Sequence, residues 1–428
     1  MKCHYACGSA EHLLERRKFL GTLAGAAGAA TIGFGRLLEA ALPELAANQK
    51  HILIIYMAGG LSQLESWDPK PKTDTGGPFR AIATSVPGLH ISELLPYSAK
   101  QMHHLAVVRS INTKEDDHGK GQYCMTTGRR QEPVAVYPHL GAVGAKLLAP
   151  ESSPLPGHIH ISPGGGGGTS NDAAFLGPKY ASIMLGGGNA PQNTSPPEGL
   201  SAQADQRRNA FRAAVNDHFA RRRRSAESDA FVSSFDQARQ LMERREVFDV
   251  TKEPAADLER YGSHEFGRHC LLARRLLENG VSCVQVSHSN YDTHNENFDF
   301  HIEQLGEFDA TFATLVADLV DRGLWKSTLL VVMSEFGRTP TINHRFGRDH
   351  WGTAWSVVLG GCGIQPGAVI GKTNDNGTAV ADREVDHGHL FHTYLQAVGV
   401  ESTSKFETSG RSIPMADPAA EPITELLA

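Results

Sequence analysis

Five short apolar runs, each followed by polar or glycine-rich sequence, constrain the fold of this chain more than any other feature. They lie at residues 51–57, 105–111, 281–287, 328–334 and 354–359 and are rich in aliphatic and β-branched residues. Runs of this length and composition are typical of strands that are buried on both faces of a sheet. We therefore predict a central sheet that is covered on both sides.

Segments with helical periodicity separate these runs. Ser263 is a suitable N-cap for a helix that ends before Gly280, and a second helical pattern ends before Gly323. Strands that alternate with helices of this length predict an α/β fold with a mostly parallel sheet. The apolar faces are marked by Phe266, Cys270, Ala273 and Leu277 in the first helix and by Leu305, Phe308, Phe312, Leu315 and Leu319 in the second.

Two stretches differ in composition from the rest. Residues 163–200 contain ten glycines and five prolines, which predicts a loop or a lid rather than core. Residues 201–260 are predicted to be helical and carry twelve basic and eleven acidic residues, including the arginine run at 221–224. This balance favours a solvated helical surface over a nucleic-acid patch.

Charge and cysteine content exclude several classes of protein. The 428 residues include 41 Lys and Arg against 47 Asp and Glu, a formal charge of −6, so no overall positive field would hold nucleic acid or an anionic membrane. Six cysteines without a Cys-x-x-Cys pair exclude a disulfide scaffold, a zinc knuckle and a thioredoxin-like centre.

The first 47 residues are typical of a twin-arginine export signal. Arg16 and Arg17 precede residues 21–35, of which ten are Ala or Gly. That segment is shorter and less apolar than the ~20 residues of a stable membrane span. We expect export to the periplasm or cell envelope, cleavage near Ala46, and membrane contact only if the leader is retained.

Acidic, imidazole and guanidinium side chains follow the ends of the predicted strands. Because the carboxyl ends of parallel strands meet at one edge of a sheet, we expect these side chains to converge there. They are Ser62, Glu65 and Asp68 after the first run, His288, Asp292 and His294 after residues 281–287, Glu335 and Arg338 after residues 328–334, and Arg348, Asp349 and His350 in the next loop.

Convergence of Asp292, Glu335 and Asp349 requires a positive charge between them. Two like charges ~4 Å apart cost roughly 4 kcal/mol at an effective dielectric constant near 20. A divalent cation with carboxylate and imidazole ligands, Zn²⁺ or Mn²⁺ rather than Ca²⁺, would supply that charge. Buried ion pairs with Arg338 and Arg348 would do the same, and the residues leave both solutions open.

Over residues 50–428 the chain resembles the family called domain of unknown function 1501. The motifs that carry this resemblance are GGLSQLESWDPKP at 59–71, YDTH at 291–294, SEFGRTP at 334–340 and GRDHW at 347–351, with FLGP at 175–178 as a weaker match.

That family is similar in turn to the alkaline phosphatase and sulfatase superfamily. The resemblance implies one domain over residues 48–428, an α/β three-layer sandwich in which residues 163–260 form a loop and a helical insert. It implies metal-dependent hydrolysis of phosphate or sulfate esters, of small molecules or of polysaccharides, without nucleic acid. By this resemblance Asp292, His350 and either His294 or His288 bind one metal ion. Glu335, Asp349 and Glu65 are further candidate ligands.

The chain departs from the superfamily pattern at several positions. Ala58 and Gly59 stand where an Asp usually follows the first strand, and Phe336 replaces one imidazole ligand. His118 occupies the place of the nucleophile, as a phosphoryl acceptor, a general base or a metal ligand. Ser62, in a glycine-rich turn, is the rival nucleophile, and Arg338 completes the candidate catalytic group.

The missing ligands keep two alternatives open. One is a non-catalytic relative that acts as an envelope, carbohydrate-binding or assembly protein. The other is an enzyme of the phosphomutase type, since fold alone does not fix function.

Overall fold

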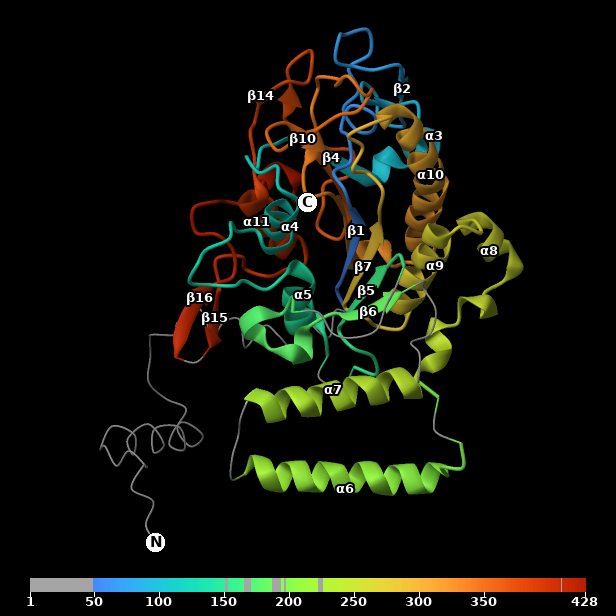
Figure 1. Ribbon diagram of the computed structural model, residues 1–428, viewed down its shortest axis with the longest axis vertical. Helices are drawn as coiled ribbons and strands as arrows, with labels where there is room; N and C mark the ends of the chain where they lie inside the picture. The colour runs from blue at the N-terminus through green and yellow to red at the C-terminus, as the bar shows by residue number, and fades with distance from the viewer. Residues whose placement is uncertain are drawn as a thin grey trace.

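The computed structural model describes residues 49–150, 153–164, 171–186, 194–195, 198–221, 226–408 and 410–428. The predicted export signal at residues 1–47 lies outside the described residues. The described chain forms an α/β structure in which helices cover both faces of one large sheet (Figure 1).

The central sheet has eight strands and is mostly parallel, as predicted. Only β11 runs antiparallel to its neighbours β4 and β8. In order across the sheet the strands are β12 (Val369–Ile370), β4 (Leu105–Ile111), β11 (Trp355–Gly361), β8 (Thr328–Met333), β1 (His51–Met57), β7 (Cys283–His288), β5 (His158–Ser162) and β6 (Ile183–Gly186).

The apolar runs form the middle of this sheet because both of their faces are covered. Every residue of β1, β7 and β8 is buried. Successive residues of a strand point to opposite faces. Accordingly Leu53 and Ile55 join the core on one side, whereas Ile52 and Ile54 join the core on the other.

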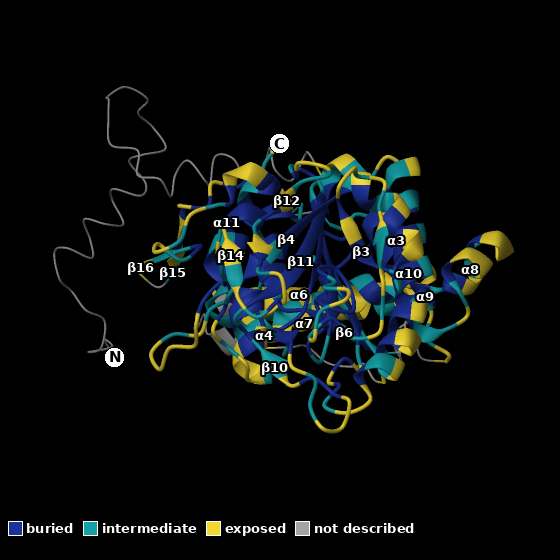
Figure 2. Cartoon of the chain, turned by 90° about the horizontal axis from the view of Figure 1, so that it is seen from above, coloured by how far each residue is buried: buried dark blue, intermediate teal, exposed yellow. Residues whose placement is uncertain are grey.

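The two helical layers pack against these two cores. Seen from above, the sheet is buried between layers whose outer surfaces are exposed (Figure 2). One layer contains α3 (Pro96–Gln101), α9 (Glu265–Glu278) and α10 (Asn297–Asp321), and the other contains α4 (His118–Thr127), α5 (Leu140–Leu148) and α11 (His387–Ala397).

Two sequence expectations are wrong in detail. The N-cap of α9 is His264 rather than Ser263, because the His264 ring accepts a hydrogen bond from the Gly267 N–H at 3.2 Å. Within the predicted loop at 163–200, β6 pairs in parallel with β5 and buries Ile183 and Leu185. A short edge strand needs only two apolar residues, and this pair was hidden by the surrounding glycines and prolines.

The charged insert forms helices, as predicted. These are α6 (Ala202–Ala220), α7 (Ala226–Glu243) and α8 (Ala255–Tyr261). None of the described helices combines the length and the apolar content that crossing a bilayer requires. Four small antiparallel pairs complete the chain: β2 (Ala81–Ala83) with β3 (His90–Ser92), β9 (Gly337–Arg338) with β10 (His350–Trp351), β13 (Lys372–Thr373) with β14 (Val380–Asp382), and β15 (Lys405–Thr408) with β16 (Arg411–Pro414).

Candidate functional site

The turn after β1 brings the loops after β7 and β8 close together. Gly59 has a φ of +116°, and its N–H donates to Glu335 Oε1 at 2.8 Å. A Cβ on Gly59 would lie 2.5 Å from the backbone nitrogen of Asp292. The backbone after β7 therefore fills the space that a side chain at residue 59 would need, so residue 59 cannot supply a carboxylate.

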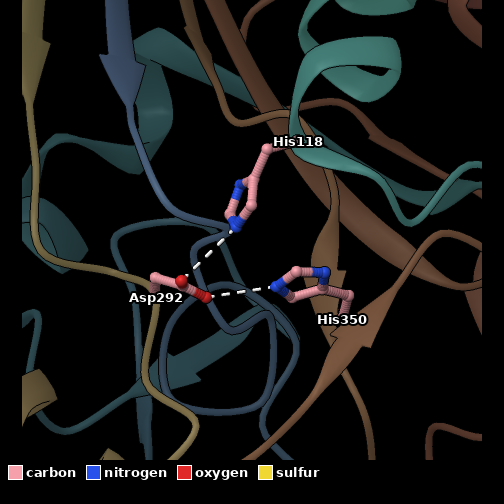
Figure 3. Close-up of side chains that lie close together, drawn as sticks. All are labelled: His118, Asp292 and His350. Carbon is pink, nitrogen blue, oxygen red and sulfur yellow. Dashed lines mark hydrogen bonds and ion pairs between the residues drawn. The ribbon is translucent and has the colours of Figure 1, made fainter.

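Asp292 lies at the centre of the cluster (Figure 3). Its Oδ1 accepts from Arg338 at 2.5 Å and lies 3.1 Å from Nε2 of both His294 and His350. Its Oδ2 lies 3.4 Å from Nε2 of His118. The Asp292 side chain remains 48% exposed, so solvent and solutes reach this carboxylate.

All three imidazoles are held at Nδ1 by an oxygen acceptor at 2.7 Å. The acceptors are Glu335 Oε1 for His118, Asp349 Oδ1 for His294, and the Asp116 carbonyl for His350. An acceptor at Nδ1 fixes the ring proton there and leaves the Nε2 lone pair for a ligand. Each ring therefore presents Nε2 toward the same carboxylate.

His294 and His350 lie within hydrogen-bond distance of each other, so a proton on one Nε2 or a cation must lie between them. Their Nε2 atoms lie 3.0 Å apart. If both rings are neutral with the proton on Nδ1, two lone pairs face each other. Together with Asp292 Oδ1 these nitrogens form a triangle with sides of 3.0–3.1 Å. Ligands around one small divalent ion, with bonds of about 2.0–2.2 Å, have similar separations.

The charges at the cluster also match a divalent cation. Asp292, Glu335 and Asp349 contribute three negative charges, and Arg338 contributes one positive charge, which leaves a surplus of two. Burial raises the pKa of Asp292, but the hydrogen bond and charge of Arg338 and the neighbouring imidazoles lower it to about 2. The hydrogen bond from His294 lowers the pKa of Asp349. Both carboxylates are therefore ionised at neutral pH.

One set of residues satisfies a direct geometric criterion for a cation site. The ligand atoms of His118, Asp292 and His350 all lie within 4.8 Å of one another. The ligand atoms of Asp292, His294 and His350 lie closer still, and within the described part of the chain no such group of His, Cys, Asp or Glu lies away from this cluster.

Arg338 is buried beneath this cluster. Its guanidinium donates to Asp292 and to the backbone carbonyls of Gly59, Gly60 and Arg348, and its side chain is 0% exposed. Arg338 was a candidate catalytic residue, and the structure places it against the carboxylate rather than in the open part of the site.

Phe336 closes the side of the cluster where the superfamily pattern has an imidazole. Its buried ring lies 4.9 Å from the His118 ring and 4.4 Å from the His350 ring, measured between centroids. An apolar ring there supplies no ligand, so the departure seen in the sequence is a departure in the site as well.

Ser62 and Glu65 are not brought into the cluster. Glu65 pairs with Arg348 at 2.8 Å, and both side chains are 0% exposed. Its second oxygen accepts from Asn297 at 3.0 Å. Ser62 is buried beside this pair, and its N–H lies 3.3 Å from Nε2 of His301. Asp68, also singled out at the strand exits, is buried and pairs with Lys70 at 3.0 Å.

His288, the alternative third ligand, points into the core. Its ring stacks on Phe266 at 4.4 Å, and its Nδ1 lies 2.8 Å from the Tyr291 hydroxyl. Burial lowers the pKa of His288 to about 3. Of the two histidines that the resemblance offered, His294 is therefore the one in the cluster.

Residues 116 and 117 contribute to the site and were not predicted. Asp117 caps α4 by accepting from the Lys120 N–H at 3.0 Å, and the Asp116 carbonyl orients His350. A Cβ on Gly121 would lie 2.8 Å from the Glu335 carbonyl, so this glycine lets α4 approach closely enough for His118 to reach Glu335. The Asp-Asp-His sequence before a helix was the available signal.

Comparisons with known proteins found solved structures to which this chain is similar at low sequence identity. A search of curated proteins found no match. The sulfatase PsFucS1 from Pseudoalteromonas sp. is similar at 13% identity and a TM-score of 0.39, covering 87% of this chain and 72% of the sulfatase. The alkaline phosphatase from the Antarctic bacterium TAB5 is similar at 12% identity and a TM-score of 0.36, covering 81% of this chain and 97% of the phosphatase.

A third solved structure is the lipoteichoic acid synthase LtaP from Listeria monocytogenes, at 8% identity and a TM-score of 0.38, covering 94% of this chain and 80% of the synthase. The match of a family model is much more specific than these likenesses. The model described as protein of unknown function (DUF1501) matches residues 49–427. The chain belongs to this family.

Proposed function

We propose that this protein is a hydrolase of phosphate or sulfate esters that depends on a single divalent metal ion. The observation that carries the proposal is the triangle of Asp292 Oδ1 and the Nε2 atoms of His294 and His350, with sides of 3.0–3.1 Å. The ester class follows from the sequence motifs that resemble the phosphatase and sulfatase superfamily.

The residues present fit a catalytic metal ion. Asp292, His294 and His350 would hold it, and two imidazoles with one carboxylate are a ligand set that suits Zn²⁺ and leaves a position for water or substrate. Such an ion polarises an ester oxygen and lowers the pKa of a water molecule. Asp349 and the Asp116 carbonyl orient two of these rings through their Nδ1 atoms.

His118 is the group available for proton transfer beside this set. Its hydrogen bond to Glu335 raises its pKa and keeps the ring oriented with Nε2 toward the open site. In that position Nε2 takes a proton from an attacking water and returns it to the leaving oxygen. Glu335 is a positioning residue in this mechanism because its contacts are with His118, Ser334 and the Gly59 N–H.

A single ion, rather than two, agrees with the surroundings of Asp292. The Arg338 guanidinium already provides a positive charge on the inner side of that carboxylate. Phe336 supplies no ligand on the adjacent side. With one guanidinium and three carboxylates, one divalent cation brings the cluster to neutrality.

Metal content and ester turnover of the purified full chain test the proposal. We expect about one equivalent of Zn²⁺ or Mn²⁺ by mass spectrometry and turnover of aryl phosphate or aryl sulfate esters. Asp292→Asn and His350→Gln should lose both, whereas His218→Gln, an exposed histidine on α6, should lose neither. A protein that binds no metal under loading conditions would contradict the proposal.

We propose further that the chain is exported in folded form by the twin-arginine route, on the basis of Arg16, Arg17 and the Ala- and Gly-rich segment that follows. Fractionation of cells tests this. Replacement of both arginines by lysine should retain the protein in the cytoplasm, and unchanged export would contradict the assignment.

A further inference from the structure

The hairpin of α6 and α7 carries an unusual share of the exposed apolar surface. Of the eleven large hydrophobic side chains that are exposed among the described residues, five lie on these two helices. They are Phe211, Val215 and Phe219 on α6, and Phe231 and Phe235 on α7. Single exposed apolar residues are ordinary, but a group of this kind indicates a contact surface.

Helix α6 turns its polar face toward the protein and its apolar face away from it. Arg212 donates to Asp236 of α7 at 3.0 Å, and its guanidinium lies 4.5 Å from the centre of the Phe235 ring. Phe211, Val215 and Phe219 are 72%, 49% and 50% exposed. A spacing of four residues places these three on one stripe of the helix. A helix held by the core would show the reverse pattern.

The charge around this apolar stripe is positive although the whole chain is acidic. Arg207, Arg208 and Arg221 are exposed on α6 or directly after it. Of the four arginines in residues 202–221, Arg208 pairs with Asp205 at 2.8 Å and Arg212 pairs with Asp236 at 3.0 Å, which leaves Arg207 and Arg221 against Asp217 and a net charge of +1. Helices that combine Phe and Leu-type residues with arginines lie in the headgroup region of anionic bilayers. A second copy would bring like charges together, which disfavours self-association through this face.

The position of the hairpin also fits contact with the surface of an anionic bilayer. In Figure 1, α6 is the outermost element at one end of the molecule, with α7 between it and the body. Residues Ser233, Gln237 and Gln240 of α7 line one cavity together with Gln49 and Lys50. Gln49, the first described residue, therefore lies on the face that carries the hairpin.

The candidate metal centre lies at the opposite end of β1. Gln49 and Lys50 precede the strand, whereas Gly59 follows it. A strand of seven residues spans about 23 Å at ~3.3 Å per residue. A surface that contacts α6 would leave the centre facing away from it.

We propose that α6 binds the surface of a membrane that contains anionic lipid, with Phe211, Val215 and Phe219 between the headgroups and the arginines on lipid phosphates. The inference does not depend on the chemistry of the metal centre. It differs from the expectation that only the leader contacts a membrane, because that expectation rested on the overall charge and the proposal rests on the local charge of α6.

Sedimentation of the full chain with vesicles tests the proposal. The probes are phosphatidylcholine vesicles with and without one quarter phosphatidylglycerol. We expect binding only to the anionic vesicles. The double variant Phe211→Ser/Phe219→Ser should bind at least about tenfold more weakly than the wild type, because two large apolar side chains no longer insert. The control Val134→Ser/Val136→Ser removes two exposed apolar side chains elsewhere and should bind like the wild type.

A second variant keeps the apolar stripe and reverses the charge. Arg207→Glu/Arg208→Glu should also lose binding by about tenfold, and raised salt should weaken the wild type. Equal binding by the wild type and both α6 variants would overturn the proposal, since the leader alone would then account for it. A wild-type dimer that the Phe211→Ser/Phe219→Ser variant converts to a monomer would overturn it in favour of a second copy.

Discussion

Arg338 and Arg348 flank one short loop, and both are completely buried, yet their carboxylate partners lie in opposite surroundings. Glu65, the partner of Arg348, is as buried as the arginine, with both side chains 0% exposed. Asp292, the partner of Arg338, is 48% exposed and also contacts three imidazoles. Arg348 therefore forms an ion pair that is closed to solvent, whereas Arg338 forms an ion pair whose carboxylate solvent reaches.

This difference separates a structural role from a chemical one. A buried carboxylate that is fully hydrogen-bonded has no position left for an ion or a substrate. A carboxylate at the surface with surplus negative charge around it retains such a position. The two solutions that the sequence left open, arginine pairs and a metal ion, therefore both have a place: Arg348 neutralises Glu65, and the Asp292 cluster suits a cation.

The largest expected effect comes from breaking the buried Glu65–Arg348 ion pair. Glu65→Ala leaves the Arg348 guanidinium buried without its partner, which typically costs 3–5 kcal/mol. Asp292→Ala should lower the free energy of unfolding by less, because water can replace this half-exposed carboxylate and the charges of Glu335 and Asp349 remain near the buried Arg338. Urea unfolding of both variants measures the contrast. Equal losses would show that the two carboxylates have the same structural role.

The next effect concerns metal affinity rather than stability. Asp349 orients His294 without belonging to the proposed ligands, and loss of such a partner typically weakens metal binding 10- to 100-fold. Asp349→Asn should therefore raise the dissociation constant for Zn²⁺ by that factor and leave the urea midpoint unchanged. Asp74→Asn, at an exposed position, is the matched control. An unchanged affinity in Asp349→Asn would remove His294 from the metal site.

The smallest expected effect is a pH dependence of the unfolding free energy that comes from the buried His288. Burial lowers the pKa of His288 to about 3, whereas the unfolded side chain titrates near 6.5. Between these values the unfolded state binds the proton and the folded state does not, so stability falls as the pH falls below about 6.5.

His288→Gln removes this titration. Between pH 7 and pH 5.5 the variant should lose roughly 1 kcal/mol less unfolding free energy than the wild type. Urea unfolding at the two pH values provides the measurement. His90→Gln, at an exposed position, should behave like the wild type. Parallel losses in the wild type and in His288→Gln would show that His288 is protonated in the folded protein.

The central strands could be predicted because helices cover both faces of the sheet and nearly every residue of these strands is buried. The runs at 51–57 and 105–111 coincide with β1 and β4, since a strand covered on both faces is largely apolar; Arg109 and Ser110 are the polar residues of β4. The strand β5 was missed because polar His158 and His160 alternate with Ile159 and Ile161 within it. β5 lies between β7 and the edge strand β6, where His158 is buried and His160 is half-buried, so the apolar signal is weaker than in the middle of the sheet.

The site was predictable as a group of candidates but not as an arrangement. Topology required the loops after β1, β7 and β8 to meet, and Asp292, His294 and His350 did meet. The exclusion of Glu65 from this group could not be derived, because Glu65 and Asp292 both follow a strand and both have an arginine partner. Only their burial distinguishes them, and burial depends on loop packing that motif spacing does not encode.

The central claim is that Asp292, His294 and His350 hold one metal ion. Crystals of the full chain grown with Zn²⁺, measured on both sides of the zinc absorption edge, test it directly. We expect one anomalous peak, about 2.0–2.2 Å from Asp292 Oδ1 and from both Nε2 atoms. No peak at this position in zinc-saturated crystals, with His294 and His350 still in direct contact with Asp292, would contradict it.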